Sequence, residues 1–447
     1  MSGPAEFKLP PLKYLVAAVV SLLLLVSFAA NEHGVSPASV RSNLGLGSDG
    51  MPVSWASGAG RTTKEQAGAV QVTEDWAQRS TWKRTAQRAY RTPCISQQAN
   101  SSTKANAAFV ILARNSDVWE ILASIRQMED RFNKHYNYPY VFLNDEPFSD
   151  NSASDYAIPS TEEFKRHTSG IASGVCTYGQ VPKAQWEEPP WIDEDKAAKA
   201  RQAMADAKVI YGGSKTYRRM CRYQSGYFFR HQLLEQYDYY WRIEPSVKFY
   251  CDLDYDPFVY MRDRGKRYGW VVSLYEYQET IPTLWQATRE FIDQNPQYLA
   301  QPNLMDWISN DGGKTYNRSN FEIGDLNFLR SDAYTKFFDH LDHAGGFSYE
   351  RWGDGTSYLS LSGPVTRRTQ RPPSTAPVHS IAAALFLKPE ELHWFHDIGY
   401  MHPPFLHCPK NSASRCACNP ADQNAFEDHW YSCTPKYKQL VPDWNKD

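Results

Sequence analysis

Hydrophobic and polar positions follow two different periods from residue 105 onward, and together they predict a folded α/β body. Ala107–Leu112 is a short apolar run of the kind that forms a buried strand. Apolar residues then recur every three or four positions from Val118 to Phe132, which predicts an amphipathic helix, and Tyr138–Leu143 is the next buried run. A strand, a helix and a strand in this order make a βαβ unit, so we expect a parallel sheet with a right-handed crossover.

The same reasoning predicts most of the remaining body. Residues 144–200 are polar and irregular, and we interpret them as loops over the sheet. The segment Asn320–Phe328 has turn and strand character, and the tail His393–Asp447 has little period of either kind. Further strands are predicted at Tyr239–Ile243, Val247–Tyr250 and Trp270–Tyr275, and helices at Tyr217–Leu234, Leu284–Asn295, Ala333–Leu341 and Val378–Leu387.

The first residues of the chain carry a different hydrophobic signal. Tyr14–Ala30 is a continuous apolar run without a charge, just long enough to cross a bilayer as a helix. Lys8 and Lys13 precede it, so the positive-inside rule predicts a cytosolic tail at residues 1–13 and a lumenal body. The alternative is a cleaved signal peptide, but the apolar part of such a peptide is usually shorter, and no clear small-x-small cleavage site follows. Residues 31–104 are rich in Ser, Ala, Gly, Thr and Gln, which is typical of a flexible stem.

Charge and cysteine content fit that interpretation. The chain has 48 basic and 50 acidic residues, and nothing in this balance suggests a surface for nucleic acid. Its 8 cysteines suit an oxidising lumen, where several are expected to form disulfides. The pairing cannot be deduced from the spacing.

The most distinctive polar pattern is an acidic group that follows a predicted strand. Glu244 ends the aromatic run that begins at Tyr239, and the chain breaks at Pro245. Asp252 and Asp254 follow within a few residues. Ligands of open α/β sheets are held at strand ends, and a carboxylate there can bind a hard divalent ion that neutralises a diphosphate. The alternative is a solvated acidic turn after a core strand.

The predicted helix Tyr217–Leu234 carries the basic residues that would complement such a site. Arginines near a strand-end metal can clamp phosphate groups. The alternative is a solvated basic face of the helix. The arginines concerned are Arg218, Arg219, Arg222 and Arg230.

Two groups in the tail resemble metal sites but lack the spacing of one. Cys416-Ala-Cys418 does not have the ligand spacing of a zinc site. Four histidines of the tail have no carboxylate or cysteine among them at ligand spacing, so we interpret them as structural. They are His393, His396, His402 and His407.

Six longer motifs, in order along the chain, resemble the fungal α-1,2-mannosyltransferases of glycosyltransferase family 15. They are YRRMCRYQSGYFF, YWRIEPSVKFYCD, SNFEIGDLNFLRSDAY, GGFSYERWGD, APVHSIAAALFL and DIGYMHPPF. The resemblance runs from about residue 105 to residue 436, and the anchor and stem match the family's architecture as well. It implies a GT-A fold at residues 105–440, meaning one nucleotide-binding α/β domain with a mixed central sheet.

The resemblance also implies an activity and a place. It implies transfer of mannose from GDP-mannose to the 2-hydroxyl of a mannose on a glycoprotein, with retention of the α configuration and with Mn²⁺ as cofactor. A type II protein of the Golgi membrane is implied, held by its single N-terminal helix with the catalytic domain in the lumen. The corresponding processes are protein glycosylation, O-linked or N-linked, and cell-wall mannan synthesis.

The family's functional residues map onto particular positions of this chain. Its metal-binding glutamate, in WRxEP, maps to Glu244, and its metal-binding histidine, in APVHS, maps to His379. Both are suitable ligands for Mn²⁺. Its proposed nucleophile, in NFEIGD, maps to Glu322. The tyrosine of its SYRxMCR pattern maps to Tyr217, which we expect near the metal and the diphosphate.

Further residues are predicted to hold the nucleotide. Asp252 and Asp254 look like the aspartate pair common in other transferases of this fold, and they rank behind Glu244. Arg222, from the basic helix, is expected to clamp phosphate. Arg114, directly after the first strand, is a candidate for holding guanine or ribose.

The sequence leaves two routes to retention open. In a double displacement, the carboxylate of Glu322 attacks the sugar from the face opposite the diphosphate. In a same-face reaction, the acceptor attacks as the diphosphate leaves, and Glu322 only stabilises positive charge.

Two segments depart from the family pattern. Residues 355–375 separate Asp354 from Ala376, which are adjacent in the family. These 21 residues correspond to 63 nucleotides, a length that keeps the reading frame, and they begin with Gly-Thr. We therefore interpret them as a retained intron translated in frame. The alternative is an exposed loop. The segment before Glu322 is shorter than the family's by four residues.

Two other functions remain possible on the sequence alone. A degenerate member would bind mannosylated glycans, or assemble with an active relative, without catalysis. A lumenal metal hydrolase would need a water-activating set of His and carboxylate ligands around an open metal site. The arginine-rich helix suits a diphosphate better than it suits a hydrolase.

Overall fold

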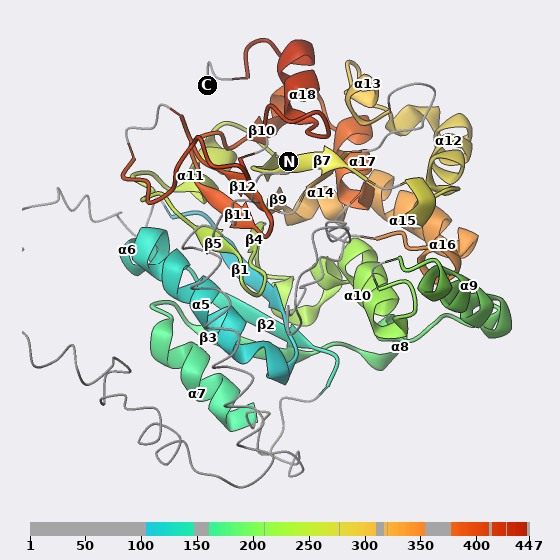
Figure 1. Cartoon of the computed structure of the whole chain (residues 1–447), viewed down its shortest axis with the longest axis horizontal. Helices are drawn as coiled ribbons and strands as arrows, with labels where there is room; N and C mark the ends of the chain where they lie inside the picture. The colour runs from blue at the N-terminus through green and yellow to red at the C-terminus, as the bar shows by residue number, and fades with distance from the viewer. Residues whose placement is uncertain are drawn as a thin grey trace, which may run out of the picture. The chain divides into compact units, whose positions relative to one another are not determined.

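A seven-stranded sheet of mixed direction forms the centre of the fold (Figure 1). Its strands are β1 Ala107–Leu112, β2 Tyr140–Asn144, β3 Cys176–Gln180, β4 Tyr239–Arg242, β6 Tyr268–Trp270, β9 Glu322–Asp325 and β10 Leu392–Trp394. They lie in the order β10-β6-β9-β4-β1-β2-β3. β9 runs antiparallel to both of its neighbours, β4 and β6, and the other neighbouring pairs are parallel.

This structure is a computed structural model. It describes residues 104–146, 161–209, 211–276, 278–309, 317–319, 321–353, 377–410, 414–425 and 427–444, all of them within the unit Ile95–Asp447. The predicted anchor, nearly all of the predicted stem and the segment 355–375 lie outside the described residues. Within the described ranges, no helix combines the length and the apolar character needed to span a membrane.

Helices connect the strands and cover the sheet. They are α5 Val118–Met128, α6 Lys134–Tyr136, α7 Thr161–Ile171, α8 Lys183–Trp186, α9 Glu194–Asp206, α10 Lys215–Gly226, α11 Pro257–Asp263, α12 Leu284–Gln294, α13 Met305–Ile308, α14 Leu326–Leu329, α15 Asp332–Ala344, α16 Gly346–Tyr349, α17 Pro377–Phe386 and α18 Thr434–Leu440. α5 joins β1 to β2, which pair in parallel, so the predicted βαβ unit is confirmed.

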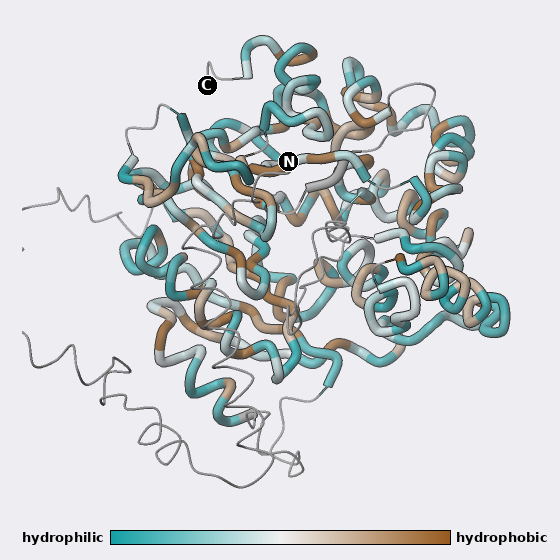
Figure 2. Tube along the Cα trace, viewed as in Figure 1, coloured by the Kyte–Doolittle hydropathy of each residue, from teal (hydrophilic) through white to brown (hydrophobic). Residues whose placement is uncertain are grey.

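Alternation along the strands divides the hydrophobic core in two. Successive side chains of a strand point to opposite faces of the sheet. Ala108 and Val110 of β1 therefore pack with α10, α12, α15 and α17, whereas Phe109 and Ile111 pack with α5 and α11. In Figure 2 the central strands are largely brown, whereas outer helices such as α9 alternate between teal and brown.

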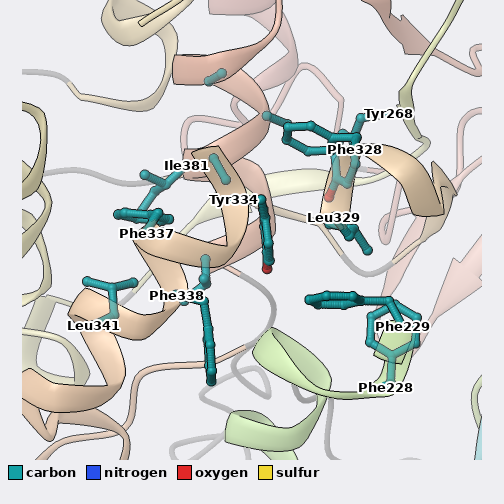
Figure 3. Packing of buried hydrophobic residues seen from close by; sticks show 14 of the residues in the cluster. Phe228, Phe229, Tyr268, Phe328, Leu329, Tyr334, Phe337, Phe338, Leu341 and Ile381 are labelled. Atoms are coloured by element: carbon teal, nitrogen blue, oxygen red, sulfur yellow. The ribbon is translucent and has the colours of Figure 1, made fainter. Parts of the chain in front are cut away.

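The core on the α15 side is rich in aromatic rings. Tyr334 of α15 lies near Phe229, which follows α10, whereas Phe338 points toward the end of α10 (Figure 3). The rings of Phe229 and Tyr334 meet edge to face, with centroids 5.6 Å apart. Buried aromatic side chains contribute large apolar areas to a core, so this cluster fixes α15 and α10 against the sheet.

A smaller sheet joins the tail to the body. It consists of β5 Lys248–Phe249, β11 Tyr400–His402 and β12 Phe405–His407, and β11 pairs antiparallel with both of the others. Two disulfides flank it, Cys251–Cys416 and Cys408–Cys418, which confirms that several cysteines are paired. A further pair of strands, β7 Ser273–Tyr275 and β8 Asn317–Ser319, is also antiparallel.

Several sequence predictions are wrong in detail. Residues 144–200 are not all loop, because they contain α7, β3, α8 and part of α9. β3 lies at the sheet edge with its side chains only partly buried, so it lacks an apolar run. The predicted strand Trp270–Tyr275 is divided between β6 and β7, which lie in different sheets. The prediction joined them because the apolar run is continuous across the division.

The predicted helix Tyr217–Leu234 also ends early, at Gly226. A β-carbon at Gly226 would lie 2.0 Å from Cζ of Phe338, so only glycine allows α15 to pack this closely. Two short 3₁₀ turns, Phe228–Arg230 and Gln232–Leu234, follow it.

Candidate functional site

A cavity of about 150 Å³ lies where β1, β2 and β4 end. Leu112 and Arg114 line it after β1, Asn144 after β2 and Glu244 after β4. The remaining walls come from α10 and its preceding loop, and from the tip of the hairpin β11–β12. The cavity therefore sits at the carboxyl ends of strands, where open α/β sheets bind ligands.

Glu244 and a histidine of the tail meet at this cavity. Both Glu244 and His402 line it, and Nε2 of His402 lies 3.3 Å from Oε2 of Glu244. The other carboxylate oxygen of Glu244 forms an ion pair with Nε of Arg242, at 2.9 Å. Nδ1 of His402 is buried and has no hydrogen-bond partner within the part of the chain that is described. A carboxylate and an imidazole with spare bonding capacity thus share one wall.

Sequence reasoning missed His402. It was interpreted as structural because no carboxylate or cysteine lies among the four tail histidines at the spacing of a metal site. The antiparallel pairing of β11 with β5 brings it next to Glu244, which lies just before β5. The only sequence signal was its position in the motif DIGYMHPPF, which carries no information about this pairing.

Tyr217 also reaches the cavity, as expected. Ser214 caps α10 by accepting a hydrogen bond from the backbone N–H of Tyr217, at 3.1 Å. This cap places Tyr217 in the first turn of the helix, where it is 6% exposed and lines the cavity. Its ring stacks on Tyr211, with centroids 5.0 Å apart.

Arg114 stands at the rim of the same cavity. Its side chain is largely exposed and forms an ion pair with Asp117, Nη2 to Oδ1 2.9 Å. The hydrogen bond to Asp117 raises the pKa of Arg114 above its already high ordinary value, so the guanidinium stays charged. Arg114 is thus available at the cavity as a cation with a fixed orientation.

Glu322 lies one layer behind this cavity and is completely buried. Its Oε1 accepts a hydrogen bond from the hydroxyl of Tyr268, at 2.8 Å, and lies 2.8 Å from Nδ1 of His379. Its Oε2 accepts one from the hydroxyl of Tyr240, at 3.2 Å, and forms an ion pair with Nη1 of Arg242, at 3.1 Å. Burial by itself would raise the pKa of Glu322, but Arg242, His379 and Tyr268 outweigh it and lower the pKa well below its ordinary value.

His379 lies in this buried cluster and has no exposed surface. It comes from α17, while Glu322 comes from β9 in the sheet beneath that helix. The residue that the structure places beside Glu244 is therefore His402, and the expected pair of Glu244 with His379 is not brought together at the cavity. Among the described residues, no three His, Cys, Asp or Glu side chains gather closely enough to hold a metal.

Three other predicted residues do not line the cavity. Arg222 is a buried residue of α10 and forms an ion pair with Asp342 of α15, Nε to Oδ1 2.6 Å. Asp252 pairs with Arg131 and Arg415 beside the disulfide of Cys251, at 2.6 Å in both cases. Asp254 is exposed. Arg222 and Asp252 form structural ion pairs, and Asp254 faces solvent. These positions disagree with the expectation that the three residues hold the nucleotide.

A second cavity, of about 340 Å³, lies beside β10 and the tail. It is lined by residues such as Trp394, His407 and Lys438, and it shares no lining residue with the first. The first is the better candidate for the active site despite its smaller volume, because it brings together Glu244, Tyr217 and Arg114.

Comparison with known proteins decides the family. Residues 62–361 and 372–441 match a family model described as glycolipid 2-alpha-mannosyltransferase. The chain belongs to this family. The resemblance drawn from its motifs is therefore confirmed. The match is interrupted at residues 362–371, inside the segment 355–375 that departs from the family pattern.

Named members of the glycolipid 2-alpha-mannosyltransferase family are similar over most of their length. The chain is 51% identical to glycolipid 2-alpha-mannosyltransferase 1 of Candida albicans, over 75% of this chain and 72% of that protein. It is 46% identical to alpha-1,2 mannosyltransferase KTR1 of Saccharomyces cerevisiae, over 75% of this chain and 78% of that protein.

Two solved structures have the same mixed α/β fold. One is core-mannan synthase A of Aspergillus fumigatus in its Mn/GDP form, with a TM-score of 0.66 and 37% identity, covering 76% of this chain and 87% of that one. The other is the mannosyltransferase Ktr4p of S. cerevisiae in complex with GDP, with a TM-score of 0.65 and 35% identity, covering 75% and 82%.

The residues of the cavity suit a divalent metal of this kind. Mn²⁺ accepts carboxylate oxygen and imidazole nitrogen ligands. Glu244 supplies the former, and His402, whose Nδ1 has no partner in the described residues, supplies the latter.

Proposed function

We propose that the protein is an α-1,2-mannosyltransferase that moves mannose from GDP-mannose to the 2-hydroxyl of an acceptor mannose, with retention of configuration. The observation that carries this proposal is the cavity at the strand ends, where Glu244, His402 and Tyr217 meet. Relatives named as α-1,2-mannosyltransferases, and a similar structure in an Mn/GDP form, support the assignment of donor and metal.

The residues of the cavity divide the work of binding the donor. Glu244 and His402 hold Mn²⁺, which when bound supplies the positive charge that stabilises the leaving diphosphate. Arg114 contributes a permanent cation at the rim, suited to guanine or ribose contacts. Apolar residues such as Leu112 and Met220 line the wall between them and reduce the access of water.

Tyr217 is the candidate for contact with the reacting sugar. It is held in place by the cap of α10 and by stacking on Tyr211, so its hydroxyl has a fixed position at the cavity. A positioned hydroxyl can orient the acceptor or the diphosphate by hydrogen bonding.

The wider setting of the enzyme is part of the same proposal. We assign the domain to the GT-A type, because it has a mixed central sheet with the candidate cavity at the ends of parallel strands. We place it in the Golgi lumen, held by Tyr14–Ala30 as a type II membrane protein, because lysines precede that apolar run and disulfides occur in the body. The acceptor is a mannosylated glycoprotein, and the products enter protein glycosylation and cell-wall mannan.

A transfer assay tests the proposed function. The full chain, purified in detergent, is incubated with GDP-mannose, Mn²⁺ and methyl α-mannoside, and the product is analysed for linkage. We expect an α-1,2-linked dimannoside that requires Mn²⁺. Its absence, with a family relative active under the same conditions, would support the alternative of a non-catalytic member that binds mannosylated glycans.

A further inference from the structure

The geometry points to a positioning role for Glu322: its buried carboxylate fixes Arg242, and Arg242 in turn fixes the carboxylate of Glu244 at the cavity. On this inference Glu322 does not attack the sugar. His379 holds Glu322 in place and does not bind the metal. The inference rests on the proposed function for the identity of the metal and the sugar, and it adds a role for each residue behind the cavity.

Both carboxylate oxygens of Glu322 are occupied. Tyr268 and His379 lie at 2.8 Å from Oε1, and Tyr240 and Arg242 lie at 3.2 and 3.1 Å from Oε2. The side chain has no exposed surface. A nucleophile must bring an oxygen to within roughly 3–3.5 Å of the sugar carbon. That approach would require Glu322 to lose partners that hold it from both sides.

Arg242 separates Glu322 from the cavities. A pocket of about 30 Å³, lined by Arg242 and Gln224, adjoins the main cavity and shares Glu244 and Met220 with it. Glu322 lines neither space. Arg242 therefore stands between the place where the sugar binds and the carboxylate of Glu322.

The register of the sheet places Arg242 and Glu322 side by side. Arg242 on β4 is paired directly with Glu322 on the antiparallel strand β9, so the two side chains share one face. Tyr240 lies two residues before Arg242 on β4 and therefore on that same face. The result is a continuous path of close polar contacts from His379 through Glu322, Arg242 and Glu244 to His402.

This path explains why a residue remote from the cavity would matter to it. Arg242 is 5% exposed, so its guanidinium cannot exchange a lost carboxylate partner for bulk water. With both Glu322 and Glu244 present, it is held between them. Without Glu322, Arg242 can turn toward Glu244 and compete with the metal for that carboxylate. Groups that hold metal ligands in this way typically change metal affinity by roughly 10–100-fold when mutated.

The test measures the affinity of the protein for Mn²⁺ in the absence of a mannose donor and of an acceptor. Mn²⁺ binding to the full chain in the presence of GDP is followed by titration calorimetry for the wild type, Glu322→Gln and Arg242→Gln. We expect each variant to bind Mn²⁺ about 10-fold or more weakly than the wild type, since each interrupts the same path to Glu244. Wild-type Mn²⁺ affinity in folded Glu322→Gln would overturn the inference.

A second measurement on the wild type covers the case in which a variant does not fold. The protein is incubated with a 2-fluoro analogue of GDP-mannose, and its intact mass is recorded. A nucleophilic Glu322 would form a bond to the anomeric carbon and expel GDP, which would leave a mannosyl adduct on that residue. We expect no such adduct, and its detection on Glu322 would overturn the inference.

Tyr268→Phe provides a matched control, because it removes one donor to Glu322 and leaves the ion pairs of Arg242 intact. We expect its Mn²⁺ affinity to stay within about threefold of the wild type, a smaller change than for Arg242→Gln. The outcomes also separate this inference from the proposed function. Failure of the wild type to transfer mannose contradicts the function, whereas unaltered Mn²⁺ binding in Glu322→Gln contradicts only the positioning role.

Discussion

At the scale of single residues, the structure reverses the positions that the sequence predicted for two histidines. His379 was expected to bind metal and is fully buried against Glu322, whereas His402 was expected to be structural and lies beside Glu244 at the cavity. An imidazole can bind metal only where the metal can reach it. Exposure to the cavity, which is a tertiary property, therefore separates the two.

Substituting each histidine in turn tests this assignment. We expect His402→Ala to lower Mn²⁺ affinity and Mn²⁺-dependent transfer by about 100-fold while the fold is kept. His379→Ala removes a partner from a buried carboxylate, so its main effect should be on stability, at about 2–4 kcal/mol. Titration with Mn²⁺ and unfolding in urea, applied to both variants, provide the comparison. The assignment fails if His379→Ala weakens Mn²⁺ binding more than His402→Ala does.

Gly324 is a position where packing, not backbone freedom, requires glycine. A β-carbon there would lie 2.5 Å from Cε1 of Tyr240, one of the donors to Glu322. We expect Gly324→Ala to lower the free energy of unfolding by about 1–3 kcal/mol, because the buried ring has to move. Gly170→Ala is the control, because Gly170 lies in α7 with nothing within 4 Å of its added carbon, and alanine favours a helix. Urea unfolding should show loss of stability in the first variant and none in the second.

At the scale of elements, the small sheet of β5, β11 and β12 determines where His402 lies. The disulfide Cys251–Cys416 and the ion pairs of Asp252 attach the tail to this sheet. Asp252 was expected to bind nucleotide, and the structure gives it this attachment instead. Arg415 and Cys416, farther along the tail, thus help to hold the hairpin that carries His402.

The charge of Asp252 predicts a dependence of stability on pH. Partial burial would raise its pKa, but Arg131 and Arg415 outweigh that effect and lower the pKa below its ordinary value of 3.8. Because the pKa is lower in the folded protein, the ionised Asp252 contributes its full stabilisation above pH 3.8. This stabilisation is lost as the pH falls through the lowered pKa. We expect Asp252→Asn to lower stability by about 1 kcal/mol at pH 7 and to match the wild type near pH 2. A difference between the two melting temperatures that grows on acidification would contradict this.

At the scale of the whole molecule, the segment 355–375 is the main departure from the family. The family match is interrupted at residues 362–371, and α17 with His379 begins at Pro377, directly after the segment. Because α17 packs on the sheet beside Glu322, residues inserted before it can displace the support of the site. The interpretation of the segment as a retained intron stays a prediction.

Deleting residues 355–375 tests its effect on the enzyme. We expect the shortened full chain to transfer mannose at least 10-fold faster than the chain as written, because α17 then follows the body without the extra residues. The same assay of GDP-mannose transfer measures both forms. Equal activity would make the segment a tolerated loop, and transcripts that mainly retain these codons would argue against an intron.

Local patterns predicted the elements that are long or strongly apolar. β1, β2, β4, α5, α12 and α15 follow the hydrophobic period, because each buries one face or both faces over several residues. Short or exposed elements were missed. β10, β11 and β12 have three residues each, too few for a period to emerge, and β3 lies at the sheet edge with its side chains only partly buried.

By itself, the sequence determined the α/β class, the family and the position of Glu244 at a strand end, because these depend on hydrophobic period, ordered motifs and local breaks in the chain. Only the tertiary structure decided which charged residues meet. Arg222 and Asp252 form buried or partly buried ion pairs, and Glu322 lies behind Arg242. Strand pairing places His402 next to Glu244. These contacts join residues that are distant along the chain, and a local sequence pattern contains no information about them.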